Sequence, residues 1–268
     1  MLWARIHFGA AGRELALAAA SPGDDSIRAI LLDIEGTTTP IDFVFKTLFP
    51  YARTRLNQFL MEHGNQTNVR EDIEALRDQH ASDTAKNLHP PRWMDSSPLL
   101  ELGSAAAYAV WLIDRDSKCS ALKSLQGKIW QEGYRKGELR GEVYPDVPTA
   151  LVRWRREEKV IAIFSSGSVL AQKLLFSSAA AGDLTKYLHA YFDTTTGAKN
   201  APQSYAQIAR TLKVEPAAVL FVSDVEKELE AAKAAGMLTA LCVRGKFTGQ
   251  PAGTHRVIHS FEEIFGAD

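Results

Sequence analysis

Short runs rich in valine, isoleucine and leucine recur along the chain, and helical patterns lie between them. We predict strands at residues 29–34, 160–164, 190–192, 219–222 and 239–243. We predict helices between and after them at residues 149–158, 169–177, 202–212 and 225–235. Apolar strands that alternate with helices are typical of βαβ units, whose parallel sheet is covered on both faces. The sequence therefore predicts an α/β protein with a mostly parallel sheet.

Residues 43–144 interrupt this alternation, because they contain no convincing strand pattern. Ser97 and Pro98 are good helix-start residues in front of an apolar stretch, and residues 122–137 repeat apolar side chains at helical spacing. A long helical segment between the first strand and the rest of a sheet is most simply a separate lid.

The predicted domain organisation follows from this insertion. Residues 26–44 and 145–268 form the predicted catalytic core, and residues 45–144 form the predicted helical cap. The first 25 residues are rich in alanine and carry a single acid, Glu14. We predict that residues 1–25 are a disordered tail or a targeting segment, and we exclude them from the fold.

Composition narrows the possible partners. The formal net charge of −1 gives no support for a nucleic-acid partner, which favours a basic face. No apolar stretch approaches the roughly 20 residues of a membrane span, so no membrane partner is predicted. The two cysteines, Cys119 and Cys242, lie far apart, which argues against a disulfide scaffold or a zinc site and fits a reducing cytosolic compartment.

Polar side chains follow the predicted strands, at the sheet edge where ligands bind in parallel α/β proteins. They are Asp33 and Glu35 at the end of the first strand, Ser165 and Ser166 after the second, Lys199 after the third, and Asp224 after the fourth, with Glu228 one helical turn further on. Each has an ordinary explanation as a turn, cap or solvated residue. Their order on successive strands nevertheless indicates one site.

This set of side chains suits phosphoryl transfer. Asp33 can attack phosphorus and form an aspartyl-phosphate, provided that Mg²⁺ neutralises the repulsion between the two anions. Serine hydroxyls at a helix N-terminus suit phosphate oxygens, and Lys199 supplies a fixed positive charge. Glu35, two residues after Asp33, can protonate the leaving oxygen and later activate water.

The pattern strongly resembles the haloacid dehalogenase superfamily of phosphatases. The residues that carry the resemblance are the nucleophile Asp33, Ser165, Lys199, and the acidic Asp224 with Glu228. Most members have aspartate two residues after the nucleophile, where this chain has Glu35. The segments DIEGTTTPIDFVFKTLFPYA and IFSSGSVLAQKLLF are similar to the enolase-phosphatases of methionine salvage, also called acireductone synthases, and ALKSLQGKIW, YFDTTTGAKN and LFVSDV fit the same family.

This resemblance implies a Rossmann-like core with an inserted helical cap. It implies a bifunctional, Mg²⁺-dependent phosphoric monoester hydrolase that first enolises 2,3-diketo-5-methylthiopentyl-1-phosphate and then removes phosphate. The product would be the acireductone 1,2-dihydroxy-3-keto-5-methylthiopentene. The family acts as monomers in the cytoplasm, and eukaryotic members also occur in the nucleus.

The resemblance also implies the roles of the site residues. Asp33, Glu35 and Lys199 would be catalytic. One Mg²⁺ per monomer would be held by Asp33, by the main-chain carbonyl of Glu35 and by Asp224. Ser165, Ser166 and Lys199 would bind the phosphate of the substrate.

Several alternatives stay open. The chain can be a phosphatase of the same superfamily for another small phosphate ester, or a non-catalytic phosphate-binding scaffold. Glu228 can support the metal through water or be an ordinary charge on a helix face. Core packing is the default for Trp93, Trp111 and Trp130 in the predicted cap, although one of them can line a pocket for the methylthio tail.

Overall fold

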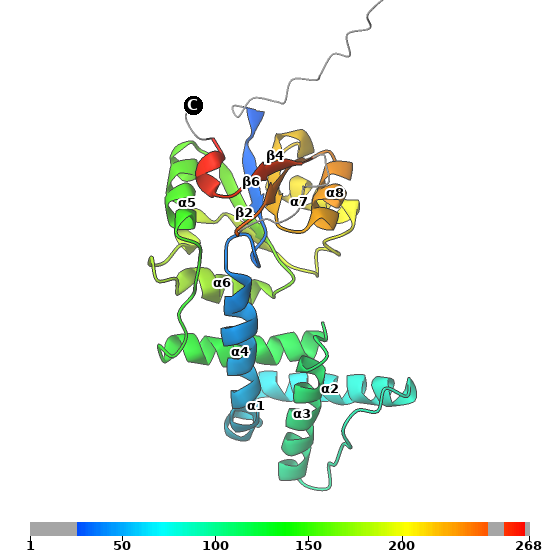
Figure 1. Cartoon of the computed structure of the whole chain (residues 1–268). Helices are drawn as coiled ribbons and strands as arrows, with labels where there is room; N and C mark the ends of the chain where they lie inside the picture. The colour runs from blue at the N-terminus through cyan, green and yellow to red at the C-terminus, as the bar shows by residue number, and fades with distance from the viewer. Residues whose placement is uncertain (1–25, 246–254, 266–268) are drawn as a thin grey trace, which may run out of the picture.

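The computed structural model describes residues 26–245 and 255–265, so the predicted tail at 1–25 lies outside the described residues. A six-stranded parallel sheet with the order β3-β2-β1-β4-β5-β6 forms the core (Figure 1). Its strands are β1 (Ala29–Leu32), β2 (Val160–Phe164), β3 (Ala190–Phe192), β4 (Val219–Ser223), β5 (Leu238–Cys242) and β6 (Arg256–Ile258). The predicted α/β class with a parallel sheet is confirmed.

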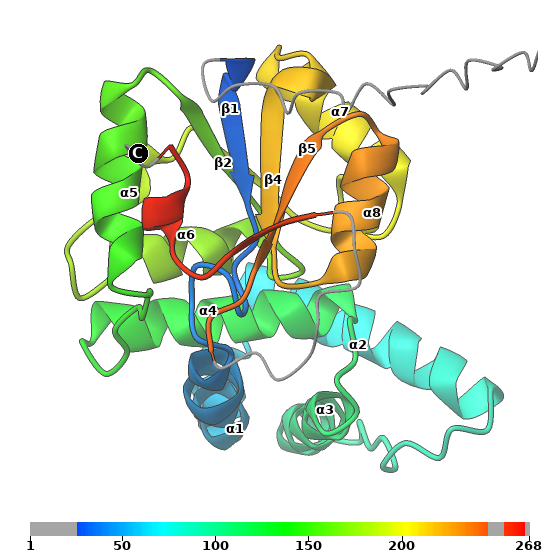
Figure 2. The ribbon, with the colours of Figure 1, turned by 45° about the horizontal axis from the view of Figure 1, so that its top comes forward.

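Helices cover both faces of this sheet (Figure 2). One face packs on α5 (Asp146–Arg156) and α6 (Val169–Ser177), and the other on α7 (Pro202–Leu212) and α8 (Glu226–Ala234). Three short 3₁₀ helices complete the core: η3 (Thr185–Tyr187), η4 (Pro216–Ala218) and η5 (Phe261–Glu263). Successive residues of β1 alternate between the two hydrophobic layers, with Ile30 and Leu32 in one and Ala29 and Leu31 in the other. Burial on both faces explains why the strand sequences are continuously apolar.

Several predicted elements differ from the structure. The first strand ends at Leu32 instead of residue 34, because the Ile34 carbonyl oxygen accepts hydrogen bonds from the N–H groups of three successive threonines, 37 to 39, and so closes a turn. The helix predicted at 149–158 begins at Asp146 and ends at Arg156. The strand β6 was not predicted, because it is a three-residue edge strand with an exposed arginine.

The segment after β1 is helical, as predicted. It contains the π-helix η2 (Phe43–Leu48), followed by α1 (Phe49–His63), α2 (Thr67–Ala85), α3 (Pro98–Ile113) and α4 (Ser120–Arg135). Ser97 caps α3 as expected, since its hydroxyl accepts a hydrogen bond from the N–H group of Leu100 at 3.3 Å. The domain boundaries at 44/45 and 144/145 stay predictions, and η2 runs across the first of them.

The chain leaves the core and returns to it at nearly the same place. The N–H group of Tyr144 donates to the Thr38 carbonyl oxygen at 2.9 Å. Arg244 adds a second link, because its guanidinium donates to the Thr37 carbonyl oxygen at 2.9 Å and pairs with Asp146 at 2.6 Å. The cap helix α4 then lies across the carboxyl ends of the strands (Figures 1 and 2).

Candidate active site

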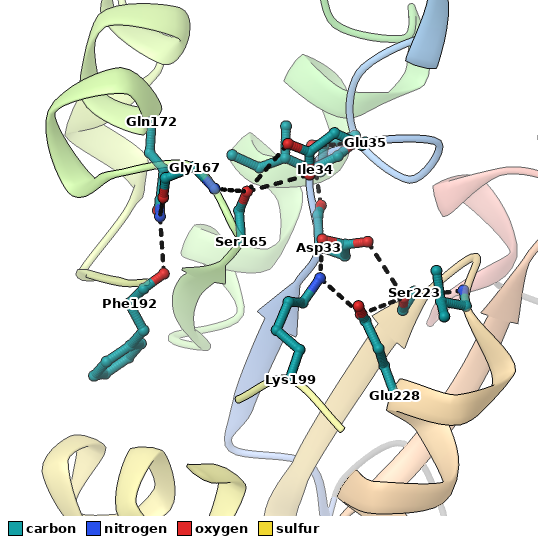
Figure 3. A network of polar contacts seen from close by, with 12 residues as sticks. Asp33, Ile34, Glu35, Ser165, Gly167, Gln172, Phe192, Lys199, Ser223 and Glu228 are labelled. Atoms are coloured by element: carbon teal, nitrogen blue, oxygen red, sulfur yellow. Dashed lines mark hydrogen bonds and ion pairs between the residues drawn. The ribbon is translucent and has the colours of Figure 1, made fainter. Parts of the chain in front are cut away.

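Asp33 directly follows the central strand β1, and only 2% of it is exposed. Its N–H group donates to the Val222 carbonyl oxygen at 3.0 Å, which fixes the backbone at the edge of the sheet. Its carboxylate lies 2.5 Å from the Lys199 ammonium and accepts a hydrogen bond from the Ser223 hydroxyl at 3.3 Å (Figure 3). Asp33 is therefore a buried carboxylate held in one orientation.

Lys199 lies between two carboxylates, those of Asp33 and Glu228, and its nitrogen is 2.6 Å from Glu228 (Figure 3). Burial disfavours the charge of Lys199, but the two carboxylates outweigh burial and raise its pKa. The loop that carries Lys199 is held from α7, because the Tyr205 hydroxyl donates to the Lys199 carbonyl oxygen at 2.6 Å. Glu228 thus holds the lysine, a role that neither sequence-based alternative included.

Glu35 reaches toward the second strand, where the Ser165 hydroxyl donates to its carboxylate at 3.2 Å (Figure 3). The hydroxyl of Ser165 accepts a hydrogen bond from the N–H group of Gly167 at 3.0 Å. Burial and repulsion from Asp33 raise the pKa of Glu35. The structure therefore places a carboxyl with reduced acidity two residues after Asp33.

Asp224 lies against the turn that follows Asp33. Gly36 has a φ of +75°, and a Cβ added there would collide with the Asp224 carboxylate, so the approach requires glycine on both counts. Partial burial of the carboxyl group and repulsion from Asp33 raise the pKa of Asp224 to about 6, although the residue as a whole is exposed. The same two causes raise the pKa of Glu228 to about 7.

This charge balance fits a divalent cation. Four carboxylates, those of Asp33, Glu35, Asp224 and Glu228, face the single ammonium of Lys199. Mg²⁺ prefers oxygen ligands and usually uses one or two protein carboxylates. No hydrogen bond within the described part of the chain reaches the Glu35 carbonyl oxygen, which leaves it available as a further ligand.

The side chains of these acids do not gather as a ready-made ligand cluster. Among residues 26–245 and 255–265, the group whose ligand atoms all lie within 4.8 Å of one another is Glu62, His63 and Glu132 in the cap. His63 also contacts Gln66 at 2.9 Å, and these groups need no ion to explain them. The geometry at Asp33 is thus compatible with Glu35 acting through its carbonyl oxygen, as the resemblance implies.

A pocket separates α4 from the carboxyl ends of the strands. Its core side contains Glu35, Ser165 and Ser166, and its cap side contains Lys123 and Trp130. Most of the rest is apolar: Ile34, Val44, Leu48, Phe49, Ile113, Leu122 and Leu175. Such a pocket suits a small molecule with one anionic and one apolar end.

The tryptophans have different environments. Trp130 is 7% exposed, lines the pocket, and donates from its indole nitrogen to the Leu48 carbonyl oxygen at 2.8 Å. Trp93 and Trp111 instead pack around Tyr108. Trp93 and Trp111 therefore pack against neighbouring aromatic rings, as the core-packing alternative predicts. Trp130 both packs in the core and lines the pocket.

The structure thus brings Asp33, Glu35, Ser165, Lys199 and Asp224 to one sheet edge. Ser166 lies beside them, and its carbonyl oxygen accepts a hydrogen bond from Lys123 at 3.1 Å. Sequence reasoning missed that Lys123 and Gln126 line this pocket, because both lie on a cap helix far from the strand ends in sequence. The only available signal was the similarity of the segment ALKSLQGKIW, which contains both.

Comparison with known proteins identifies the family of the chain. Residues 27–236 match the family model of the haloacid dehalogenase-like hydrolases. The chain is 49% identical over 239 residues to the enolase-phosphatase E1 of Synechococcus elongatus, covering 89% of this chain and 98% of that protein. It is 43% identical to the enolase-phosphatase E1 of Drosophila grimshawi, covering 82% and 88% of the two chains.

The chain belongs to the enolase-phosphatase E1 family. Among solved structures, the UTR4 protein of Saccharomyces cerevisiae aligns with a TM-score of 0.71 at 34% identity, covering 88% of this chain and 99% of that chain. CbbY of Rhodobacter sphaeroides aligns with a TM-score of 0.51 at 18% identity, which shows the shared fold alone. The enolase-phosphatase resemblance read from the sequence is therefore confirmed, together with the haloacid dehalogenase-like fold.

Proposed function

We propose that this chain is the enolase-phosphatase of methionine salvage. It enolises 2,3-diketo-5-methylthiopentyl-1-phosphate and then removes phosphate to give the acireductone 1,2-dihydroxy-3-keto-5-methylthiopentene. Enolase-phosphatase relatives at up to 49% identity support this assignment. The structural observation that carries it is the buried Asp33 carboxylate, held by Lys199 at the carboxyl end of the central strand.

In the phosphatase step, Asp33 is the nucleophile. One of its carboxylate oxygens forms a bond to phosphorus, and the ester oxygen leaves and takes a proton from Glu35. Water activated by the same Glu35 then hydrolyses the aspartyl-phosphate. Ser165, Ser166 and Lys199 bind the phosphoryl oxygens, and the positive charge of Lys199 favours the transition state, where negative charge is spread over those oxygens.

One Mg²⁺ per monomer is part of the proposal. The carboxylates of Asp33 and Asp224 and the carbonyl oxygen of Glu35 would hold it. When bound, it would offset the charge of the clustered carboxylates and of the substrate phosphate.

In the enolase step, Glu35 is our candidate for moving the proton. The hydrogen bond from Ser165 orients its carboxylate, and burial with repulsion from Asp33 raises its pKa, so it holds a proton more readily than an ordinary carboxyl does. The apolar pocket wall that includes Trp130 would take the methylthio end.

We propose a monomer that acts in the cytoplasm. Within the described residues, no helix has both the length and the apolar character needed to cross a bilayer. The substrate is a small phosphate ester, and no nucleic-acid or membrane partner enters the proposal.

Supplying the purified chain with the diketone phosphate and Mg²⁺ tests the assignment directly. We expect enediol absorbance to rise first and phosphate to follow. Release of phosphate without any enediol signal would indicate an ordinary phosphatase for another ester, and no turnover of any ester would indicate a scaffold.

Replacing Asp224 by asparagine is expected to weaken Mg²⁺ binding at least about 10-fold, because a charged ligand is lost. The measurements are the Mg²⁺ concentration for half-maximal phosphate release and the Mg²⁺-dependent rise in melting temperature. Glu226→Gln is the matched control, since it removes one negative charge from the exposed start of α8, two residues after Asp224. Equal Mg²⁺ affinity in Asp224→Asn and the parent chain would remove Asp224 from the metal site.

A further inference from the structure

The cap helix α4 presents a stripe of three side chains to the pocket: Lys123, Gln126 and Trp130. Their spacing of three and four residues places them on one helix face. At 1.5 Å per residue, Gln126 lies about 4.5 Å and Trp130 about 10 Å along the axis from Lys123. The stripe thus runs from a cation through an amide to an aromatic ring.

Lys123 lies at the phosphate-binding end of this stripe. Its ammonium donates to the Ser166 carbonyl oxygen at 3.1 Å and to the Thr194 hydroxyl at 3.2 Å. An ammonium has three donors, so one remains for a ligand. In the part of the chain that the structure describes, no carboxylate lies within 4.0 Å of this nitrogen, unlike that of Lys199. Burial, with repulsion from Lys118, lowers the pKa of Lys123.

Gln126 is the second polar group of the stripe. It is only 6% exposed, and its amide makes no hydrogen bond to any residue in the ranges 26–245 and 255–265. The amide atoms of Gln126 are not among the fully enclosed side-chain atoms that lack a partner, so they keep accessible surface, and the residue lines the pocket. An amide in this position has donor and acceptor capacity that no protein group uses. Since this amide borders the pocket, its missing partner is expected to be a ligand.

We propose that Lys123 and Gln126 bind the two neighbouring carbonyl oxygens of an α-diketone, with Lys123 on the oxygen next to the phosphate-bearing carbon. This inference rests on the proposed function and deepens it. The order of the stripe matches the order of groups in such a substrate. Phosphate would lie at Ser166, the two carbonyl groups at Lys123 and Gln126, and the apolar tail at Trp130.

The arrangement gives Lys123 a role in enolisation. The C1–H bond breaks, and its proton passes to Glu35, the base proposed above. The electron pair of that bond becomes the C1=C2 double bond, and the carbonyl π pair moves onto the C2 oxygen. The Lys123 ammonium hydrogen-bonds this developing enolate oxygen and then protonates it to the enol. A fixed donor at such an oxygen favours the transition state over the ground state.

Lys123 has a simpler explanation as a clamp that joins the cap to the core through Ser166 and Thr194. A clamp and an enolate donor predict different kinetics. Loss of a clamp affects every phosphate ester alike, because the cap closes over all of them. Loss of the enolate donor affects the diketone far more than an ester with no carbonyl group.

The test compares Lys123→Met and Gln126→Leu with the parent chain and with Lys136→Met, a matched control at the exposed end of the same helix. Each is assayed for enediol formation from the diketone phosphate and for hydrolysis of p-nitrophenyl phosphate. Relative to any loss on the aryl ester, we expect Lys123→Met to lose about 100-fold more of enediol formation, the usual effect of removing one oxyanion donor. We expect Gln126→Leu to lose about 10-fold more, and Lys136→Met to lose nothing on either substrate.

A conservative variant shows whether a loss of activity comes from misfolding. Lys123→Arg retains the positive charge and the donor, so it is expected to recover part of the enediol rate that Lys123→Met loses. Equal losses on both substrates, or no loss on the diketone, would overturn the assignment of Lys123. If the parent chain hydrolyses the aryl ester and forms no enediol, the proposed function fails instead.

Discussion

Asp33→Asn is expected to reduce phosphate release from every ester by at least about 10⁴-fold, as removal of a nucleophile does in other enzymes with covalent intermediates. The amide has nearly the same shape as the carboxylate, so it can keep its place beside Ser223 and Lys199. It cannot form the aspartyl-phosphate, because a neutral amide is a poor nucleophile. The fold should survive, since the change also removes one of four clustered negative charges.

Two measurements check this prediction. Phosphate release is followed with the diketone phosphate and with p-nitrophenyl phosphate, and melting temperature reports the fold. A control variant, Asp42→Asn, removes an exposed carboxylate of the same type that pairs with Lys46. If Asp33→Asn retained more than about 1% of the parental rate, covalent catalysis by this side chain would be excluded.

Lys199→Met is expected to impair both catalysis and folding. The loss of a fixed positive charge beside the transferring phosphoryl group should lower turnover roughly 10²- to 10³-fold. The loss of its ammonium also leaves the buried carboxylate of Asp33 and the half-buried carboxylate of Glu228 without a counter-charge, which typically costs about 3–5 kcal/mol. Few single changes elsewhere in the chain should affect both properties this strongly.

The pH dependence of stability separates the two effects. The pKa of Glu228 is already raised to about 7 with Lys199 present, and removal of the lysine raises it further. A carboxyl whose pKa is higher in the folded than in the unfolded state stabilises the folded protein at low pH. That contribution is lost as the pH rises from the unfolded pKa through the folded pKa. Lys199→Met should therefore melt at a higher temperature at pH 5 than at pH 8.

A double variant completes the test. Adding Glu228→Gln to Lys199→Met removes one unpaired charge, so it should restore part of the stability while turnover stays low. If stability and turnover recovered together, Lys199 would be a structural residue. Unfolding by denaturant and phosphate release, measured on the same preparations, decide between these outcomes.

The sheet could be predicted from the sequence because most of its strands are buried on both faces, which makes those strands continuously apolar. The edge strand β6 escaped prediction for the opposite reason, since Arg256 in it is exposed. The turn that ends β1 depends on three threonine N–H groups that share one carbonyl oxygen. That pattern is a property of backbone geometry, which residue types alone do not specify.

The part of the site that lies at the strand ends could be predicted from the sequence. Asp33, Ser165 and Asp224 each lie at or just after the end of a predicted parallel strand, so one rule about strand ends brings them together. The pairing of Glu228 with Lys199 joins a helix to a distant loop and has no local signature. The place of Lys123 and Gln126 in the pocket could not be predicted for a related reason. Their helix face becomes a pocket wall only when the cap packs on the core.

The hydrogen bond between Thr38 and Tyr144 has a consequence for how such enzymes diversify. Since the two junctions of the inserted segment touch, a graft that replaces everything between them has to span only a short gap. The strands and Asp33 would keep their support from Arg244 and the surrounding loops. Specificity modules can therefore be recombined with one unchanged reaction centre, which makes this junction a natural site for engineering new substrate ranges.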